Sequence, residues 1–586
     1  MLFQDLVGVY DVVESTSSRL EMTDILADLF RKAEPSSLRK IVYLTQGQLF
    51  PDFYPLKLGL ADKLLLKTLS ACCGARDTQI QELWLKEGDP GLVAQSIFQK
   101  RRQTTLFSDP LTLERVYDNL VQIARSEGSG SQETKMKLLA DILNDASPSE
   151  AKFISRIVTG RMRLGASAMT VVDALAIAFA SKEDRDTVER AFNVSSDLGK
   201  VAELLATNGI EAVKGMKVTV GNPLRAMLAE RLPSPKEILE RMNGKAAFEY
   251  KYDGLRVQAH LSDGKVQLFS RRLEDLTAQF PDVAETIVKS FRGKSAIVEG
   301  ECVPIDINTG ELLPFQEVSH RRGRKHGLEQ SIEDYPVKVF LFECVFLNGE
   351  DLTEMPFPDR RKALQSAFEV TEEVRFSEMR MLENEEGVES FFQEALRDGC
   401  EGLMAKSVAE DSFYRAGARG FLWIKYKKEY RSEMTDTVDL VVVGGFAGRG
   451  KRKGVYGALL MATYNQTEDV FETVSKLGSG FDDATLAQLP VMLERYRLPE
   501  KSHKVRSKMP ADYWFEPGVV LEVLGAEITI SPIHTAASGR FREGSGLAIR
   551  FPRFTGKVRE DKSPREATTT EELVEMHSKQ LKKITE

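Results

Sequence analysis

The chain has 586 residues, of which 42% are hydrophobic and 29% are charged, and a formal net charge of −8. At about 150 residues per domain, this length predicts three or four domains of an ordinary soluble protein. The acidic balance excludes a simple basic coat for nucleic acid, so contacts with phosphate must come from local clusters of cations. Four clusters interleave with glycines and aromatics, although any single one could be a solvated face; they are Lys100–Arg102, Arg321–Lys325, Lys425–Lys428 and Arg449–Lys453.

The five cysteines form no recognisable metal or disulfide pattern. Cys72 and Cys73 are adjacent and the others are isolated, so no CxxC pair exists. This usage fits a reducing, intracellular compartment. The N-terminus lacks the basic-then-apolar order of a signal peptide, and no apolar run approaches the roughly 18 residues needed to cross a bilayer. We therefore expect a cytoplasmic protein without membrane association.

Residues 1–220 are predicted to be mostly helical. Apolar residues such as Leu26, Leu29 and Phe30 recur at helical spacing. The stretch 150–180 predicts two helices separated by a turn near Gly165. These patterns indicate an all-α N-terminal domain.

From about residue 245 the apolar period changes to that of strands. Strand-like runs separated by turn signals cover 246–251, 255–261, 266–271, 295–305 and 337–347, with a tight turn at 262–265 and a helix at 390–399. Beyond residue 430, strands such as 439–446 and 457–464 alternate with Gly-rich turns, which is typical of a small barrel, and the chain ends in a charged helix or tail. The predicted fold is multidomain α+β, divided at 1–220, 221–429 and 430–586.

Nucleotide-binding loops rich in glycine are not supported. Gly293, Lys294 and Ser295 match the end of GxxxxGK[ST], but Val288 stands where the first glycine is required.

The most informative stretch is EYKYDGLRVQAH at 249–260. Lys251 ends a strand, Asp253 and Gly254 form a turn, and Arg256 begins the returning strand. A lysine held rigidly and partly desolvated there can, as a neutral amine, attack the α-phosphate of a nucleoside triphosphate. Alone the motif is weak, because a lysine flanking an ordinary hairpin would look the same.

Carboxylates and cations further along strengthen this interpretation. Glu299 and Glu301 are two apart on a strand and share a side, which suits Mg²⁺, and Glu401 offers another carboxylate. Lys425 and Lys427 are also two apart and present two ammonium groups on one face to neutralise a triphosphate. Phe342 lies in an apolar strand and could pack against a base or belong to the core.

The ordered set KYDGLR, SRR, EGE, FLFEC, EGLMAK, WIKYKK and RxDK resembles the nucleotidyltransferase motifs of the ATP-dependent DNA ligases of archaeal and eukaryotic replicative type. The match is collinear from 249 to 562. The resemblance implies a monomeric enzyme that uses ATP and Mg²⁺ to seal 5′-phosphate/3′-hydroxyl nicks in duplex DNA through a lysine–AMP intermediate, in replication, repair and recombination. The resemblance implies that Lys251 is the adenylated nucleophile, that Glu249 contacts the adenine amine and that Phe342 stacks on adenine. It places Arg256 and Arg271 on the ribose and 5′-phosphate, Glu301 and Glu401 on the metal, and Lys425 and Lys427 on phosphates. Arg559, Asp561 and Lys562 would form the last motif, on a mobile barrel.

The resemblance extends over essentially the whole chain. Residues 430–586 are similar to the family's oligonucleotide-binding (OB-fold) barrel and 1–220 to its DNA-binding domain, where Arg161 and Arg163 would meet backbone phosphates, with plain bundle packing as the alternative. The segment QTTLF resembles a sliding-clamp-binding peptide through Gln103, Leu106 and Phe107. The alternative is an ordinary loop in which Leu106 and Phe107 are buried. Three positions depart from the family pattern; they are Glu343 in place of aspartate, Arg272 in place of asparagine and Lys557 where arginine is common.

Two other readings of the sequence compete. An RNA ligase or RNA-capping nucleotidyltransferase would share the lysine motif, but the helical N-terminal third and the RFPRF…REDK ending argue against both. A non-catalytic DNA-binding scaffold is opposed by the intact Lys251, Glu301 and Glu401. NAD-dependent ligation is disfavoured because the expected cysteine-rich zinc module is missing.

Overall fold

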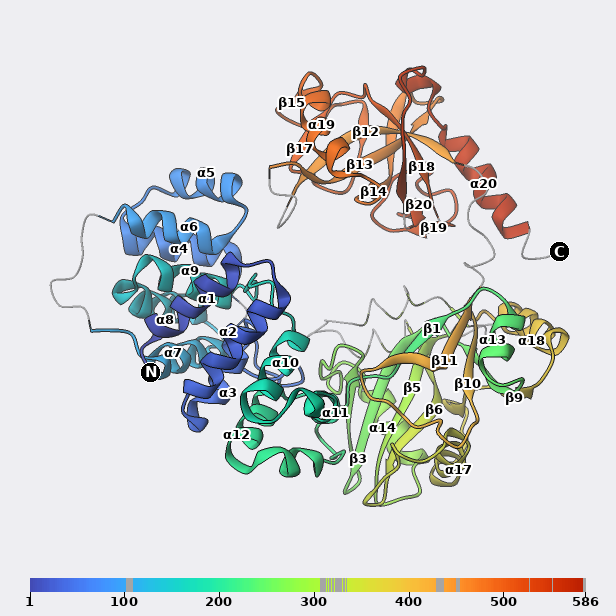
Figure 1. Cartoon of the computed structure of the whole chain (residues 1–586). Helices are drawn as coiled ribbons and strands as arrows, with labels where there is room; N and C mark the ends of the chain where they lie inside the picture. Colours follow the sequence, from blue (N-terminus) through green and yellow to red (C-terminus); the bar gives the residue numbers. More distant parts are fainter. Residues whose placement is uncertain are drawn as a thin grey trace. The chain divides into compact units, whose positions relative to one another are not determined.

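In a computed structural model of the chain, the structure describes residues 1–586 except 59, 102–108, 306–311, 314, 316–317, 319–320, 322–328, 330–331, 333–334, 428–436, 449–453, 526, 551 and 583–586. These residues form two compact units (Figure 1). The first comprises 1–77 and 90–427, and the second comprises 78–89 and 428–586. No helix within the described ranges is long and apolar enough to cross a membrane.

The N-terminal third is helical, as predicted. Its α-helices are α1 (Phe3–Ser15), α2 (Arg19–Lys32), α3 (Pro35–Thr45), α4 (Asp62–Cys73), α5 (Asp77–Glu87), α6 (Pro90–Gln99), α7 (Leu113–Arg125), α8 (Ser131–Asp145), α9 (Pro148–Val158), α10 (Ala168–Phe179), α11 (Arg185–Ser195) and α12 (Leu198–Lys214). Ser147 and Glu150 form a capping box that starts α9, and the Ser167 side chain caps α10. The predicted turn near Gly165 therefore lies between two helices with defined starts.

Two β-sheets follow in the same unit. One has the strand order β1-β11-β10-β2-β9, and the other has the order β4-β3-β5-β6-β7 with β8 paired to β6. Their strands are β1 (Leu228–Arg231), β2 (Ala246–Lys251), β3 (Leu255–Ser262), β4 (Lys265–Ser270), β5 (Ser295–Pro304), β6 (Val337–Leu347), β7 (Glu350–Asp351), β8 (Val374–Phe376), β9 (Met379–Leu382), β10 (Gly402–Ser407) and β11 (Arg419–Lys427). The strands predicted between 246 and 347 are confirmed to within two residues at each end.

Helices cover the sheets. They are α13 (Pro235–Arg241), α14 (Pro281–Ser290), α17 (Phe357–Ala367) and α18 (Glu385–Arg397) (Figure 1). Phe391 of α18 is buried with Phe248 and Leu403 of the first sheet, whereas Ile287 of α14 is buried with Leu341 of the second. Each sheet thus has its own apolar core, because each needs a helix layer to remove its apolar face from water.

The strand after Lys251 does not return beside the strand that carries it. β2 pairs with β10 and β9, whereas β3 pairs with β4 and β5. Residues 252–254 therefore cross from one sheet to the other, and the predicted returning strand is wrong. Turn residues mark a change of direction but do not say which strand lies alongside. A hairpin does form at the next turn, where Asp263 and Gly264 have φ of 53° and 70°, as a two-residue primed turn requires.

The second unit is strand-rich and its main sheet is curled. β12 (Val438–Ala447) pairs with β13 (Tyr456–Asn465) and, along its other edge, with β17 and β18. Because the long strand β12 pairs with different strands along its two edges, the sheet curls toward a closed barrel. Such curling is what the predicted OB-fold requires. The remaining elements are β14 (Val470–Leu477), α19 (Asp483–Glu494), β15 (Arg497–Leu498), β16 (Val505–Arg506), β17 (Tyr513–Phe515), β18 (Val520–Leu524), β19 (Glu527–Ser531), β20 (Gly546–Arg550), β21 (Arg553–Val558) and the terminal helix α20 (Thr570–Lys582).

Substitution of Gly402 should test the central strand of the first sheet. Gly402 has φ of 144°, and a Cβ there would overlap the carbonyl of Tyr426 and lie 2.9 Å from the Phe392 ring. We expect Gly402→Ala to lower the free energy of unfolding by roughly 2–4 kcal/mol, seen as a lower Tm in calorimetry. The matched control is Gly420→Ala on neighbouring β11, where no atom lies within 4 Å of the added Cβ. Equal Tm values for the two variants would contradict this account of the strand.

Candidate active site

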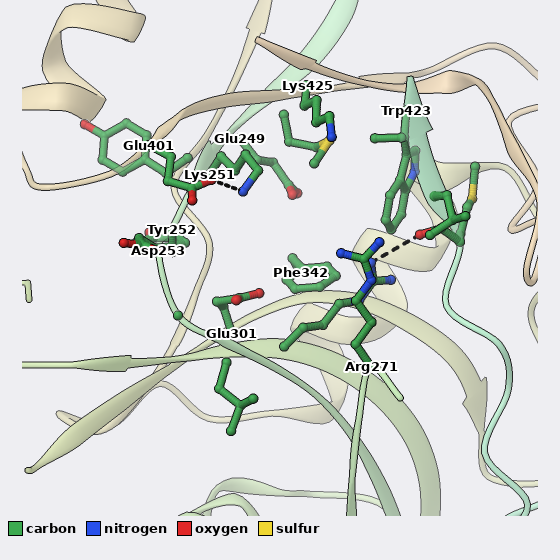
Figure 2. A pocket seen from close by; sticks show the side chains of 18 of the residues that line it. Glu249, Lys251, Tyr252, Asp253, Arg271, Glu301, Phe342, Glu401, Trp423 and Lys425 are labelled. Atoms are coloured by element: carbon green, nitrogen blue, oxygen red, sulfur yellow. Dashed lines mark hydrogen bonds and ion pairs between the residues drawn. The ribbon is translucent and has the colours of Figure 1, made fainter. Parts of the chain in front are cut away.

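A pocket of about 780 Å³ lies between the two sheets of the first unit (Figure 2). One sheet contributes Lys251 from β2 and Lys425 from β11, and the other contributes Glu301 from β5 and Phe342 from β6. Glu401, which precedes β10, completes this set. Residues that are 150 positions apart in the sequence therefore surround one cavity.

Strand register explains why the cations gather. Gly402 of β10 is paired with Lys251 on one side and Lys427 on the other, and Met404 is paired with Glu249 and Lys425 in the same way. Residues two apart on a strand point to the same face. Lys425 and Lys427 consequently both line the pocket, and the prediction that they share a face is confirmed.

Glu401 binds two ammonium groups. Its Oε2 accepts from Lys251 Nζ (Figure 2). The same oxygen lies 2.7 Å from Lys427 Nζ. Burial by itself would raise the pKa of Glu401, but the two lysines outweigh it and lower the pKa. Lys425 stands beside this group, and burial followed by repulsion from Lys427 and Lys251 lowers its pKa. The pocket is therefore cationic enough to attract phosphate oxygens.

Two further carboxylates in the pocket are electrostatically unsatisfied. Burial raises the pKa of Glu301 to about 7 even though Lys251 and Arg256 act in the opposite direction. The pKa of Asp253 is raised by burial and by the charge of Glu401. A divalent cation would stabilise the charged forms of both groups, and the charge of Glu401 acts on both of them. The residues present therefore fit a metal held by Glu301 and Glu401. Among the described residues no group of three or more His, Cys, Asp or Glu side chains is preformed as a metal site.

Glu299 does not join this metal group. It shares a strand face with Glu301, as predicted, but it is 1% exposed and does not line the pocket. Its Oε2 accepts from Arg256 Nη2 at 2.8 Å and from the Tyr414 hydroxyl at 3.0 Å. Glu299 therefore does not add to the Mg²⁺ site that its spacing from Glu301 suggests, because Arg256 already neutralises its charge.

The deep end of the pocket holds a buried ionic group. Glu249 is 2% exposed, its Oε2 lies 2.7 Å from Lys406 Nζ, and its Oε1 lies 3.4 Å from Arg361 Nη1. Oε1 has no hydrogen-bond partner in the part of the chain that is described, so it can accept from a ligand. Burial lowers the pKa of Lys406, whose Nζ lies 5.0 Å from the centre of the Phe342 ring. Phe342 is half-buried and lines the cavity, as stacking on a base requires.

Several lining residues were not foreseen from the sequence. Lys406 lies two positions after Met404 and Trp423 lies two positions before Lys425, a strand spacing that could have identified both. Met227 belongs to a segment far upstream that lacks a sequence signal. Arg271 and Arg272 are exposed at the rim.

The remaining predicted residues lie outside this pocket. Arg161 and Arg163 occupy the loop between α9 and α10, where Arg161 Nη1 lies 3.1 Å from Asp62 Oδ2 and Arg163 has φ of 55°. In the second unit, Arg559 and Lys562 both bind Asp439, at 2.8 and 2.6 Å. Arg559 also binds Asp561 at 2.8 Å and lowers the pKa of that carboxyl far below its usual range.

Some predicted clusters and departures can be assigned. Arg321 is 1% exposed and bonds to Asp282, so the prediction that it belongs to a cationic surface cluster is wrong. Glu343, at the position where the family has aspartate, is buried against Arg360, with Nε–Oε1 of 2.9 Å. Gln103, Leu106, Phe107 and most members of the other cationic clusters lie outside the described residues.

Comparison with known proteins gives consistent matches along the chain. Residues 2–176 match "DNA ligase N terminus", 226–427 match "ATP dependent DNA ligase domain", and 452–562 match "ATP dependent DNA ligase C terminal region". The chain is 51% identical to "DNA ligase 2" of Thermofilum pendens, covering 98% of this chain and 97% of that protein. It is 49% identical to a DNA ligase of Caldivirga maquilingensis, covering 99% and 98%. The solved structure "Pmar-Lig_Pre." shares the fold at a TM-score of 0.55 and 15% identity, covering 95% of this chain and 99% of that one.

The raised pKa of Glu301 predicts a pH dependence of stability without metal. A carboxyl whose folded pKa is about 7, against an ordinary value of 4.5, holds its proton more tightly in the folded state. The stability that this protonated carboxyl contributes to the folded protein is therefore lost as pH rises through 7. We expect Glu301→Gln to be more stable than the wild type at pH 8, by up to about 3 kcal/mol, with the difference vanishing below pH 5. Thermal unfolding in chelator at several pH values measures this. A pH-independent difference would contradict the assignment.

Proposed function

The chain belongs to the family of ATP-dependent DNA ligases, and from that premise we propose that Lys251 is the amine that carries AMP from ATP to a DNA nick. The enzyme joins DNA by forming phosphodiester bonds and uses ATP and a divalent metal such as Mg²⁺. Roles in DNA replication and repair are typical of this family. The observation that carries the assignment of Lys251 is its position beside Glu401 and Lys427 in a cationic pocket between two sheets.

The first step forms a nitrogen–phosphorus bond. The ammonium of Lys251 must lose a proton to solvent before its nitrogen attacks the α-phosphorus of ATP, and the Glu401 carboxylate in contact with it holds it in place. Pyrophosphate leaves with the electrons of the broken phosphorus–oxygen bond. Lys425 and Lys427 face the same cavity and neutralise charge that develops on the phosphate oxygens.

Two transfers complete the reaction. A 5′-phosphate oxygen of the nick attacks the adenylate phosphorus and breaks the bond to Lys251, and the 3′-hydroxyl then attacks the 5′-phosphorus and releases AMP. We assign Arg256 and Arg271 to the ribose and the 5′-phosphate. A divalent cation held by Glu301 and Glu401 would supply further neutralisation of the phosphate oxygens.

The base is recognised at the deep end of the pocket. The free acceptor Oε1 of Glu249 suits the exocyclic amine of adenine, and Phe342 offers a ring face for stacking. An acceptor at this point disfavours guanine, which presents a carbonyl oxygen there. The matches of family models to both flanking parts of the chain favour DNA ligation over an RNA ligase, a capping enzyme or a scaffold.

The outer parts of the chain bind DNA in this proposal. We assign a helical DNA-binding domain to 1–220, with Arg161 and Arg163 on backbone phosphates, an adenylation domain to 221–429 and an OB-fold domain to 430–586. The last motif, Arg559, Asp561 and Lys562, orients pyrophosphate during the first step. The clamp-binding peptide with Gln103, Leu106 and Phe107, the monomeric state and the cytoplasmic location stay predictions.

Replacement of Lys251 tests the central assignment. Lys251→Ala removes the nucleophile, so we expect no acid-labile adduct after incubation with α-labelled ATP and Mg²⁺, and nick sealing reduced by at least about 10⁴-fold. Lys245→Ala, an exposed lysine before β2, is the matched control and should label normally. Sealing at the wild-type rate by the Lys251 variant would overturn the proposed mechanism.

Arg559 should act mainly on the first step. Arg559→Ala is expected to slow adduct formation by roughly 10²-fold or more, because a cation that orients pyrophosphate is removed. Sealing of a nick that already carries 5′-AMP should change little. Arg565→Ala, which is exposed on the same unit, is the control. An equal loss in both assays would show that the residue does not act selectively on the first step.

The proposed phosphate contacts of the helical part can be measured by salt dependence. Arg161→Ala and Arg163→Ala should each weaken binding to nicked duplex irrespective of sequence, and each should reduce the slope of log K against log salt by about 1. Titration by fluorescence anisotropy at several salt concentrations gives both values. Unchanged slopes would favour plain bundle packing for this loop.

A further inference from the structure

One face of β3 carries a row of polar side chains. Arg256, Gln258 and His260 occupy alternate positions and therefore project to the same side of the strand. Gln258 and His260 are only 5% and 2% exposed. Polar groups buried in a strand cost free energy unless they are hydrogen-bonded, so this row must find its partners inside the protein.

The partners come from the segment 215–227, which links α12 of the helical part to β1 beside the pocket and is called here the connecting segment. Three residues of this segment, spaced three positions apart, each bond to one member of the row. The bonds are Gly221 N to His260 Nδ1 at 3.0 Å, Leu224 N to Gln258 Oε1 at 2.8 Å, and Arg256 Nη1 to Met227 O at 3.2 Å. The row therefore holds the connecting segment from Gly221 to Met227, where Met227 lines the nucleotide pocket.

The members of the row are also joined to one another. His260 Nδ1 accepts from Gly221, so Nε2 carries the proton and donates to Gln258 Oε1 at 2.9 Å. Gln258 Nε2 donates to Glu299 Oε1 at 3.2 Å, and Arg256 Nη2 donates to the other oxygen of that carboxylate at 2.8 Å. Gln258 thus fixes the carboxylate that fixes the pocket arginine.

Tyr414 closes the group from the opposite side. Its hydroxyl donates to Glu299 Oε2 at 3.0 Å and accepts from Met227 N at 3.0 Å. Arg256 is consequently held between one carboxylate and one carbonyl, each of which has its own buried support. A side chain in contact with substrate is positioned accurately only when such supports fix its rotamer.

We propose that Gln258 and His260 are positioning residues for Arg256, and that through them the connecting segment sets where the guanidinium stands in the nucleotide pocket. The inference rests on the proposed role of Arg256 in binding the ribose or 5′-phosphate. It also gives the helical part a route to the pocket, because a shift of the connecting segment must displace hydrogen bonds of the same row. Neither Gln258 nor His260 lines the pocket, so both act through Arg256.

A double-mutant cycle tests the proposal on the full-length enzyme. Gln258→Met keeps the length of the side chain and removes its hydrogen bonds, and Arg256→Ala removes the group on which it acts. We expect Gln258→Met to lower kcat/KM for adduct formation or nick sealing, whichever step Arg256→Ala affects, by roughly tenfold or more. In the Arg256→Ala background the same substitution should cause no further loss, because the two residues act as one unit.

The outcomes separate the possible roles. A Gln258→Met loss that multiplies fully with that of Arg256→Ala would overturn the positioning role and leave a purely structural one. If Arg256→Ala itself changes neither step, the assigned role of Arg256 has failed, whatever the adduct assay says of Lys251. Gln267→Met, an exposed glutamine on neighbouring β4, is the matched control and should behave as the wild type.

A milder variant covers the case in which Gln258→Met does not fold. Tyr414→Phe removes a single hydroxyl from Glu299 while keeping the buried ring. In a double-mutant cycle with Arg256→Ala, Tyr414→Phe should lower the rate constant of the step that Arg256→Ala slows, and only when Arg256 is present. A loss that is equal in both backgrounds, with the Tm measured alongside, would also contradict the proposal.

Discussion

The arrangement on which the pocket depends is a single carboxylate, Glu401, between the ammonium groups of Lys251 and Lys427. An amine that must attack phosphate has to stand among cations, and like charges brought together in a half-buried cavity repel unless an anion lies between them. Glu401 supplies that anion, and the charges of the two lysines outweigh its burial and lower its pKa. The same contact holds Lys251 in position, so the contact that balances the charges of the pocket also places the nucleophile.

The pocket exists because the chain changes sheets directly after Lys251. Residues 252–254 cross to the second sheet, and a Cβ on Gly254 would lie 2.5 Å from the carbonyl oxygen of Cys302 and 2.9 Å from Cγ of Glu301. Only glycine allows this close approach. The nucleophile and Glu301, one of the two carboxylates that fit a metal, therefore come from different sheets, and the nucleotide pocket lies between these sheets.

Behind the lining residues lie buried ionic and polar groups. Glu249 is neutralised by Lys406 and Arg361, whereas Arg256 is held by Glu299 and, through it, by Gln258. Burying such groups costs free energy, and removing one partner leaves the other buried without compensation. When every partner is present, the groups form rigid supports. This rigidity suits an enzyme that must hold a nucleotide in register through successive phosphoryl transfers.

The sequence by itself determined the periodicity of the helices and strands, the presence of Lys251, Glu401, Lys425 and Lys427 at strand spacings, and the resemblance that implied their chemistry. These follow from local rules, because alternation along a strand and turn residues act over a few positions. Tertiary structure alone decided that β2 and β3 belong to different sheets, that Glu299 faces Arg256 instead of a metal, and that Met227 of the connecting segment lines the pocket. Such pairings join residues far apart in the chain, and which partner neutralises a buried charge depends on packing that no local pattern records.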